Sequence, residues 1–252
     1  MNLAIPVGHV PQNITTRRKF AVGSLALLSF TCAGARAESV EAGHYDAFFL
    51  WAGVHPSPEL AHARELFLLA AEVRLTAHAG LISQRAAIPK LDNVPVWVAL
   101  RVETLEWTEN IYSGVLQILK SWRAAGNTVV GLQLDFDSGT KRLEHYGAFL
   151  ADLRARLPAE FKLGITGLLD WSGNAAGLAA LKGVVDEVVL QIYQGRRVIA
   201  NYQTYVSRLA QMPVPFRIGL LQGGEWHDPV GLRDNPNFKG FVVFLANQRG
   251  QG

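Results

Sequence analysis

The sequence predicts an α/β fold: a single-domain barrel of eight parallel strands, the (β/α)8 or TIM-type barrel. Short apolar runs alternate along the chain with helical or loop stretches, which is typical of successive βα units. Eight such runs favour a closed barrel over an open sheet, and polar residues collect at the carboxyl ends of the runs, where this fold carries its sites. The expected strands span residues 45–51, 66–73, 94–102, 129–135, 162–168, 187–193, 216–221 and 240–245.

The first 37 residues are expected to lie outside the barrel, which then spans 38–252. Thr16-Arg17-Arg18-Lys19-Phe20 precedes an apolar run over 21–31, and Ala35-Arg36-Ala37 follows it, which is the layout of an export signal. The paired arginines resemble a twin-arginine signal, and the apolar run is too short to span a bilayer permanently. We therefore expect a periplasmic or secreted protein without a membrane span once the signal is removed.

The composition of residues 38–252 excludes several functions. Four of the 24 basic residues and none of the 21 acidic residues precede residue 38, which leaves 20 against 21 and a net charge of −1. Nucleic acid is therefore not an expected partner, because its binders need a concentrated positive surface. The single cysteine, Cys32, lies in the expected signal, so disulfides and thiolate chemistry are not expected. Histidines do not follow the spacing of zinc sites, and no metal or cofactor is expected. The oligomeric state stays open.

The early crossover stretches are expected to lack full helices. The 215 residues from residue 38 onwards are few for a barrel that usually takes about 250. Residues 52–65 and 74–93 look like the trimmed connections.

The fourth strand, Val129–Asp135, carries a charged residue within an apolar run, where burial of a charge costs free energy. Because strand side chains alternate faces, Gln133, Asp135 and Asp137 share one face, and apolar residues occupy the other. Continuous apolar runs of this kind are typical of parallel strands covered by helices, where an unpaired carboxylate is costly. Two carboxylates on one face therefore point first to catalysis.

Each aspartate also has a structural interpretation. Asp137, or Ser138 after it, could cap the helix that the apolar pattern from Leu143 onwards predicts. Asp135 lies too early in the strand to cap that helix. Its structural alternative is an ion pair with a basic group on a neighbouring strand, such as Arg101.

Polar residues and tryptophans at the ends of other strands complete the candidate site, and the strand beginnings show no comparable cluster. Tryptophan rings at such a rim suit the apolar faces of sugars. Asp170, after the fifth strand, is explained equally well as an ordinary polar loop residue. The residues expected to bind substrate are Gln133, Gln191, Trp51, Trp171, Trp226, Glu72, Arg101 and Glu225.

Two segments resemble the chitinase-like barrels of glycoside hydrolase family 18. Residues 130–137 (VGLQLDFD) resemble the fourth-strand signature Asp-x-x-Asp-x-Asp-x-Glu, and residues 185–194 resemble the sixth-strand segment that ends in Met-x-Tyr-Asp. The resemblance implies that Asp137 is the catalytic acid, that Asp135 orients the substrate and that Tyr193 contacts it. The whole chain after the signal also resembles a bacterial family of exported proteins, domain of unknown function 3142.

The chain departs from the family-18 pattern at several positions. Val130 and Gln133 stand where the pattern has aspartates, and Asp137 is one methylene shorter than the glutamate of the pattern. Gln191 and Gln194 replace the methionine and aspartate of the sixth strand. These departures weaken the expectation of an N-acetylated substrate more than they weaken the expectation of a barrel.

The expected function is that of an exported glycoside-hydrolase-like protein acting on an envelope or extracellular polysaccharide. Like charge on one strand raises one pKa, and we expect Asp137, nearer the rim, to hold the proton while Asp135 stays ionised. A glycosidase needs a second carboxylate about 5 to 9.5 Å across the cleavage point, and Glu72, Glu103 and Glu225 are available. The alternative is a non-catalytic barrel that binds glycan through its tryptophans and polar rim.

Overall fold

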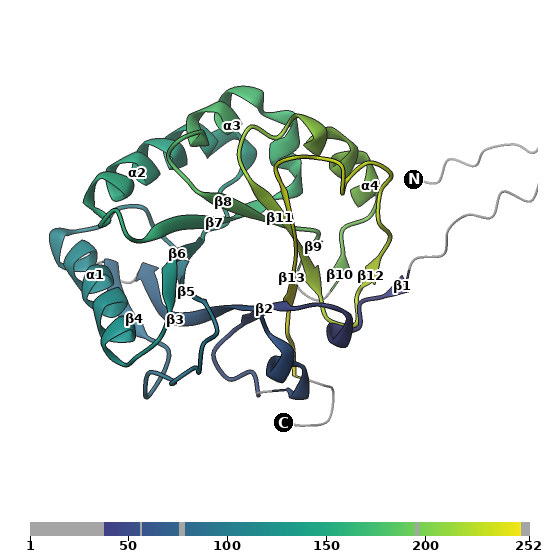
Figure 1. Cartoon of the computed structure of the whole chain (residues 1–252). Helices are drawn as coiled ribbons and strands as arrows, with labels where there is room; N and C mark the ends of the chain where they lie inside the picture. Colours follow the sequence, from purple (N-terminus) through teal and green to yellow (C-terminus); the bar gives the residue numbers. More distant parts are fainter. Residues whose placement is uncertain (1–37, 56, 76–78, 195–196, 248–252) are drawn as a thin grey trace, which may run out of the picture. The chain divides into compact units, whose positions relative to one another are not determined.

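The computed structural model describes residues 38–55, 57–75, 79–194 and 197–247, so the expected export signal lies outside the described residues. Eight parallel strands close into a barrel, which confirms the predicted fold class (Figure 1). The barrel closes through β2 (Ala47–Leu50), which pairs with β13 (Phe238–Phe244) and with β3 (Glu65–Leu75). The other barrel strands are β5 (Val96–Val102), β6 (Val129–Asp135), β7 (Lys162–Leu168), β8 (Glu187–Gln191) and β11 (Phe216–Leu221).

Four α-helices of the described chain follow consecutive strands and cover one arc of the barrel (Figure 1). They are α1 (Glu109–Ala124), α2 (Leu143–Arg156), α3 (Ala175–Leu181) and α4 (Tyr202–Val206). The longest, α1, buries Ile111, Val115 and Leu119, which are spaced four residues apart and form one apolar stripe. No helix within the described ranges combines the length and the apolarity needed to cross a bilayer.

Three connections are trimmed. After β2 the chain forms only the 3-10 helix η2 (Pro58–His62), and after β3 it turns back as β4 (Ala79–Ser83), antiparallel to β3, as the prediction of trimmed connections implied. The connection from β11 to β13 is trimmed as well, which was not predicted. There β12 (Glu225–Trp226) pairs with β1 (Glu38–Ser39). The remaining short elements are η1 (Ala42–His44), η3 (Thr140–Arg142), η4 (Leu169–Gly173), η5 (Ser207–Gln211), β9 (Tyr193–Gln194) and β10 (Arg197–Val198).

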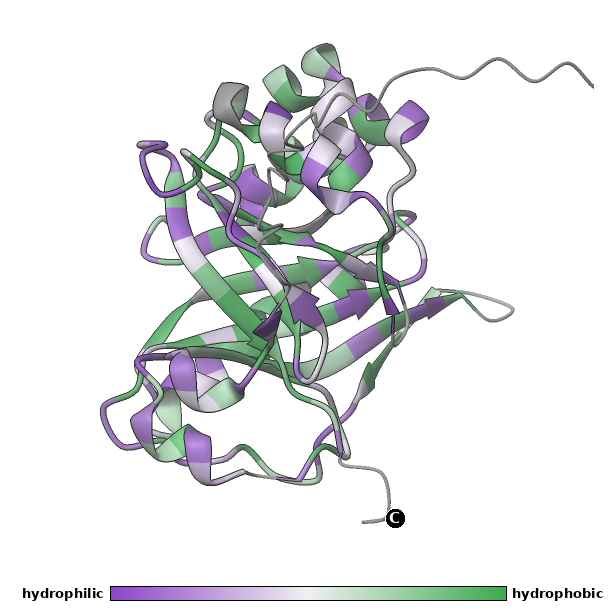
Figure 2. Ribbon diagram, turned by 90° about the vertical axis from the view of Figure 1, so that its right-hand side faces the viewer, coloured by the Kyte–Doolittle hydropathy of each residue, from purple (hydrophilic) through white to green (hydrophobic). Residues whose placement is uncertain are grey.

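The barrel interior is filled by aromatic rings. Phe49 stacks on Phe244 with the ring centroids 4.5 Å apart, and Phe67 stacks on Trp97 at 5.7 Å. These buried rings belong to one apolar cluster, while a second, larger cluster joins the other faces of the strands to the helices. The barrel strands are accordingly coloured mainly as hydrophobic in Figure 2, with hydrophilic residues along the helices and loops.

An ion-pair network lies at the amino end of the barrel, which corrects the expectation that the strand beginnings carry no cluster. Arg217 of β11 contacts Glu65, the first residue of β3, at 2.5 Å and Glu187, the first residue of β8, at 3.2 Å. The indole N–H of Trp97 donates to the other oxygen of Glu65. Burial raises the pKa of Glu187, the charge of Arg217 opposes that rise, and the charge of Glu65 adds to it. One guanidinium therefore compensates two largely buried carboxylates.

Replacing this guanidinium should destabilise the barrel in a pH-dependent way. Arg217→Met is expected to lower the free energy of unfolding by about 3 to 5 kcal/mol at neutral pH, because two carboxylates lose their counter-ion. The loss should shrink in acid, where carboxylates bind protons and the unpaired charge disappears. Denaturant unfolding at several pH values measures both effects.

Arg64→Met is the matched control, because Arg64 is 85% exposed and pairs with Asp46 at 3.6 Å on the surface. It should change stability little at any pH. Equal losses in the two variants would contradict the interpretation of the Arg217 network.

Candidate functional site

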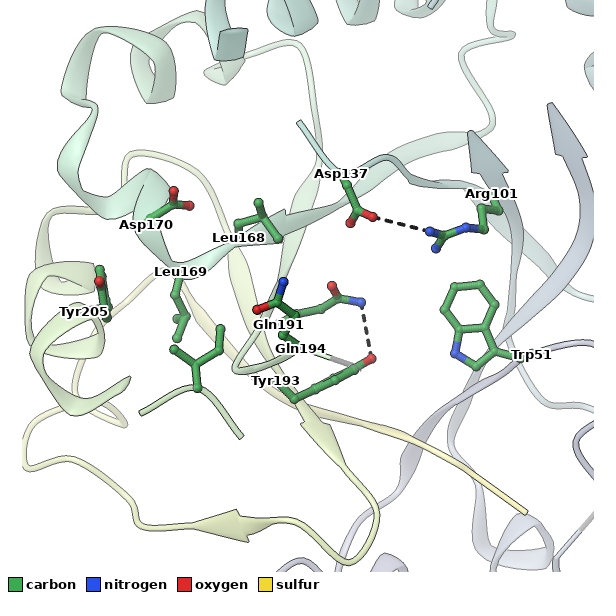
Figure 3. Close-up of a pocket in the computed structure, with 11 residues that line it drawn as sticks. Trp51, Arg101, Asp137, Leu168, Leu169, Asp170, Gln191, Tyr193, Gln194 and Tyr205 are labelled. Carbon is green, nitrogen blue, oxygen red and sulfur yellow. Dashed lines mark hydrogen bonds and ion pairs between the residues drawn. The ribbon is translucent and has the colours of Figure 1, made fainter. Parts of the chain in front are cut away.

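A pocket of about 540 Å³ opens at the carboxyl ends of the barrel strands, the end where sites of this fold lie (Figure 3). Figure 3 shows Trp51 and Arg101 on one side of it, Asp170 and Tyr205 on the other, and Gln191 and Tyr193 between them. The remaining lining residues are Asp137, Leu168, Leu169, Gln194 and Ile199.

Arg101 joins the two aspartates of the fourth strand. Its Nη1 lies 2.7 Å from Asp135 Oδ2, and its Nη2 lies 3.3 Å from Asp137 Oδ2. β5 and β6 position the first pair, since Arg101 and Asp135 are register partners across these strands. Asp137 does not cap the following helix: neither η3 nor α2 begins with a side-chain cap. The ion-pair interpretation of Asp135 therefore describes its contact, and the cap interpretation of Asp137 is wrong.

The two aspartates differ sharply in exposure. The Asp135 side chain is 1% exposed, whereas that of Asp137 is 63% exposed. Burial raises the pKa of Asp135 to about 6, the charge of Arg101 opposes this rise, and the charge of Asp137 adds to it. Oδ1 of Asp135 is also buried without a hydrogen-bond partner among the described residues. Asp135 therefore differs from the permanently ionised group that was expected, because burial makes this carboxyl bind its proton more tightly.

Polar side chains of the sixth strand form part of the pocket. Gln191 Nε2 donates to the hydroxyl of Tyr193 at 3.2 Å. Burial, followed by the charge of Asp135, raises the pKa of Tyr193 well above its usual value, so this phenol is neutral. Gln133 does not line the pocket: it is fully buried, and its Nε2 donates to Thr166 Oγ1 at 3.3 Å. It supports the site from below.

Only one of the three predicted tryptophans reaches the pocket. Trp51 lines it, and the guanidinium of Arg101 lies over its ring, 5.6 Å from the centroid. Trp171 is fully buried and donates its indole N–H to the carbonyl of Ser138, so its ring packs in the core rather than at the rim.

Trp226 is also placed elsewhere. It lies in the trimmed connection after β11, stacks on Tyr202 with centroids 5.1 Å apart, and meets Phe241 of β13 at 5.7 Å. It packs on the outside of the barrel in a connection that has no α-helix. Its ring is therefore used for packing and does not line the pocket.

The predicted glutamates lie away from the pocket lining, and a residue treated as an ordinary loop position is part of it. Glu72 pairs with Arg74 at 2.6 Å, and Glu225 is an exposed residue of β12. Asp170, in η4 directly after β7, lines the pocket and accepts a hydrogen bond from the Thr140 hydroxyl. Its place just after a strand was the available signal. Tyr205 comes from α4, and no sequence pattern marked it.

The raised pKa of Asp135 allows an experiment to decide whether this buried carboxyl stabilises the fold as an ion-pair partner or lowers its stability. A carboxyl that binds its proton more tightly in the folded state weakens folding as pH rises from about 4 to about 6, by up to about 3 kcal/mol for a shift of about two units. Asp135→Asn should remove this pH dependence and leave the melting temperature at pH 7 unchanged or higher. Arg101 keeps Asp137 as a partner and is 40% exposed, so the change does not strand a buried cation.

Thermal melts of both proteins between about pH 4 and 8 make the comparison. A loss of about 3 to 5 kcal/mol at pH 7 would instead identify Asp135 as half of an indispensable ion pair.

Solved structures are similar to this chain, and one with a TM-score of 0.50 agrees with the barrel fold. The xylanase and alpha-amylase inhibitor protein XAIP-II from Scadoxus multiflorus matches with a TM-score of 0.50 and 11% identity, over 79% of this chain and 92% of that protein. The spore cortex-lytic enzyme SleL from Bacillus cereus matches with a TM-score of 0.43 and 17% identity, over 74% of this chain. The chain spans about half of SleL, at 51%. The chitinase domain of the spore coat protein CotE from Clostridium difficile matches with a TM-score of 0.48 and 12% identity, over 70% of this chain and 65% of that one.

Sequence comparisons address the family. The comparison with curated proteins finds no match. A family model described as domain of unknown function (DUF3142) matches residues 93–200, which run from just before β5 to just after β10. This segment contains Arg101, Asp135, Asp137, Gln191 and Tyr193. The predicted resemblance to the DUF3142 family is therefore confirmed over residues 93–200, the part of the chain that supplies most of the pocket.

Proposed function

We propose that the protein is an exported glycoside-hydrolase-like barrel that acts on an envelope or extracellular polysaccharide. The observation that carries this proposal is the pocket at the barrel mouth, where an exposed carboxylate, Asp137, stands beside Arg101 and Trp51 above a buried second carboxyl, Asp135. Ligand pockets of this size usually combine apolar walls with a few convergent polar groups. Here the amides of Gln191 and Gln194 and the hydroxyl of Tyr193 suit sugar hydroxyls.

Asp137 is the proposed general acid. Its carboxylate is the more accessible of the pair, and its contact with Arg101 is the longer one, at 3.3 Å against 2.7 Å for Asp135. This accessibility allows Asp137 to reach the leaving oxygen of a bound sugar, to which a general acid gives its proton.

Asp135 acts in this proposal as an orienting carboxylate. Its short contact holds the guanidinium of Arg101 toward the buried side of the mouth. This keeps the guanidinium closer to Asp135 than to Asp137. Asp135 is therefore a positioning residue, since at 1% exposure it offers no surface to a sugar.

Asp170 is the proposed second carboxylate. Glu72, Glu103 and Glu225 do not line the pocket, whereas Asp170 does, on the side away from Arg101 (Figure 3). A carboxylate on each side of the bound sugar is the arrangement that glycosidases use. The hydrogen bond from Thr140 holds Asp170 in place.

Export is proposed from the sequence. The arginine pair, the apolar run and the small residues before residue 38 form the signal, and the destination is the periplasm or the medium. A polysaccharide substrate is consistent with that location.

Non-catalytic glycan binding is the second candidate, and one observation favours it. Arg101 pairs with Asp137 directly, so the exposed carboxylate is engaged in an ion pair instead of being free to approach a leaving oxygen. In a binding protein this pair would only have to accept hydrogen bonds from sugar hydroxyls and donate to them.

Turnover of the Asp137→Asn variant separates the two candidates. For an enzyme, the substitution should lower kcat by about 10²-fold or more and leave glycan binding nearly unchanged, because proton transfer contributes only in the transition state. Release of reducing ends from a panel of envelope and extracellular polysaccharides measures it. Asp234→Asn, an exposed position outside the pocket lining, is the matched control and should retain full activity.

A glycan that the wild-type protein binds but never cleaves would support the binding barrel. Trp51→Ala should then weaken that binding, because Trp51 is the predicted tryptophan that lines the pocket.

A further inference from the structure

The charges of the described pocket residues do not balance. Asp137 and Asp170 line the pocket and Asp135 lies directly below it, whereas Arg101 is the one basic residue among the lining side chains. Both terminal nitrogens of Arg101 already contact carboxylates, Nη1 that of Asp135 and Nη2 that of Asp137. The described residues that line the pocket therefore carry a net negative charge even when Asp135 is protonated.

Asp170 is where the excess charge is least compensated. It is exposed, it accepts a hydrogen bond from the neutral hydroxyl of Thr140, and it forms no ion pair with a described residue. Figure 3 places it on the side of the pocket away from Arg101. Any ligand that covers Asp170 removes water from an ionised carboxylate, which is costly unless the ligand brings a compensating charge.

We propose that the glycan bound in this pocket carries free, protonated amino groups: an amino-sugar polymer without N-acetylation, with an ammonium group placed against Asp170. This inference rests on the proposed function in taking the ligand to be a glycan. A neutral sugar would leave Asp170 desolvated without a counter-charge. A uronic acid would bring a further anion to a guanidinium that already has two carboxylate partners. Tyr205 and Tyr193 line the same pocket, and aromatic rings attract cations more than anions.

Calorimetric titration with three tetrasaccharides tests the proposal: glucosamine, N-acetylglucosamine and galacturonate tetramers. At about pH 6 and low salt, the glucosamine tetramer should bind at least about 10-fold more tightly than either of the others. Its affinity should fall as salt is added, because screening weakens exposed charge pairs. Asp170→Asn should weaken glucosamine binding by about 10-fold and should not weaken N-acetylglucosamine binding, because it removes a charge that a neutral sugar leaves without a partner.

Asp234→Asn is the control, because it removes the same charge from an exposed position outside the pocket lining and should leave all three affinities unchanged. Equal binding of the glucosamine and N-acetylglucosamine tetramers, or tighter binding of the galacturonate tetramer, would overturn the charge selection and leave the proposed function standing. Failure of all three tetramers to bind, together with no reducing-end release from any polysaccharide, would overturn the proposed function and this inference with it.

Discussion

Buried carboxylates in a closed barrel need a counter-charge, and in this protein one arginine pairs with two carboxylates at each end of the barrel. At the amino end Arg217 lies between Glu65 and Glu187, and at the carboxyl mouth Arg101 lies between Asp135 and Asp137. Stacked aromatic rings fill the space inside the barrel. The two arginines therefore confine charge to the ends of an otherwise apolar interior.

The two networks share a composition but differ in access. Both carboxylates at the amino end are mostly buried, with side chains 18% and 10% exposed, so that network has no surface for a ligand. At the mouth one carboxylate is buried and the other is 63% exposed. The same pairing is therefore buried at one end of the barrel and leaves an accessible carboxylate at the other.

The sequence predicted the parts of the structure that follow from local periodicity. All eight apolar runs form barrel strands, and alternation along the fourth strand correctly placed Asp135 on the face of Arg101. How deeply each side chain lies in the barrel was not predictable in this way. Alternation along a strand shows which side chains share a face of that strand, but it does not show how exposed they are. This is why the sequence did not predict that Asp135 is buried and that Asp137, two residues later, is exposed.

Most of the wrongly placed residues lie in connections between strands, where the path of the backbone decides whether a side chain reaches the pocket. Trp171 and Trp226 were predicted to lie at the rim because both follow the end of a strand. Instead, Trp171 lies in η4 and is buried in the core. Trp226 lies in the helix-free connection after β11 and packs on the outside of the barrel. Asp170 directly precedes Trp171 in η4. Adjacent residues of a 3-10 turn point in different directions, and Asp170 lines the pocket. The Arg217 network was missed because Glu65 and Glu187 stand at strand boundaries, where burial is not readable from composition.

One departure from the family-18 pattern, Gln133, fits the charge balance of the mouth. Gln133 stands where the pattern has an aspartate, and it lies fully buried beneath Asp135, bonded to the neutral hydroxyl of Thr166. An aspartate there would add a third carboxylate to a region whose one guanidinium already serves two. The amide also needs Gly164 opposite it, since a methyl group on that residue would overlap the Gln133 carbonyl oxygen. Gln133 and Gly164 therefore depend on each other: Gly164 leaves room for a neutral amide at position 133. With that amide in place, Arg101 has only Asp135 and Asp137 as carboxylate partners.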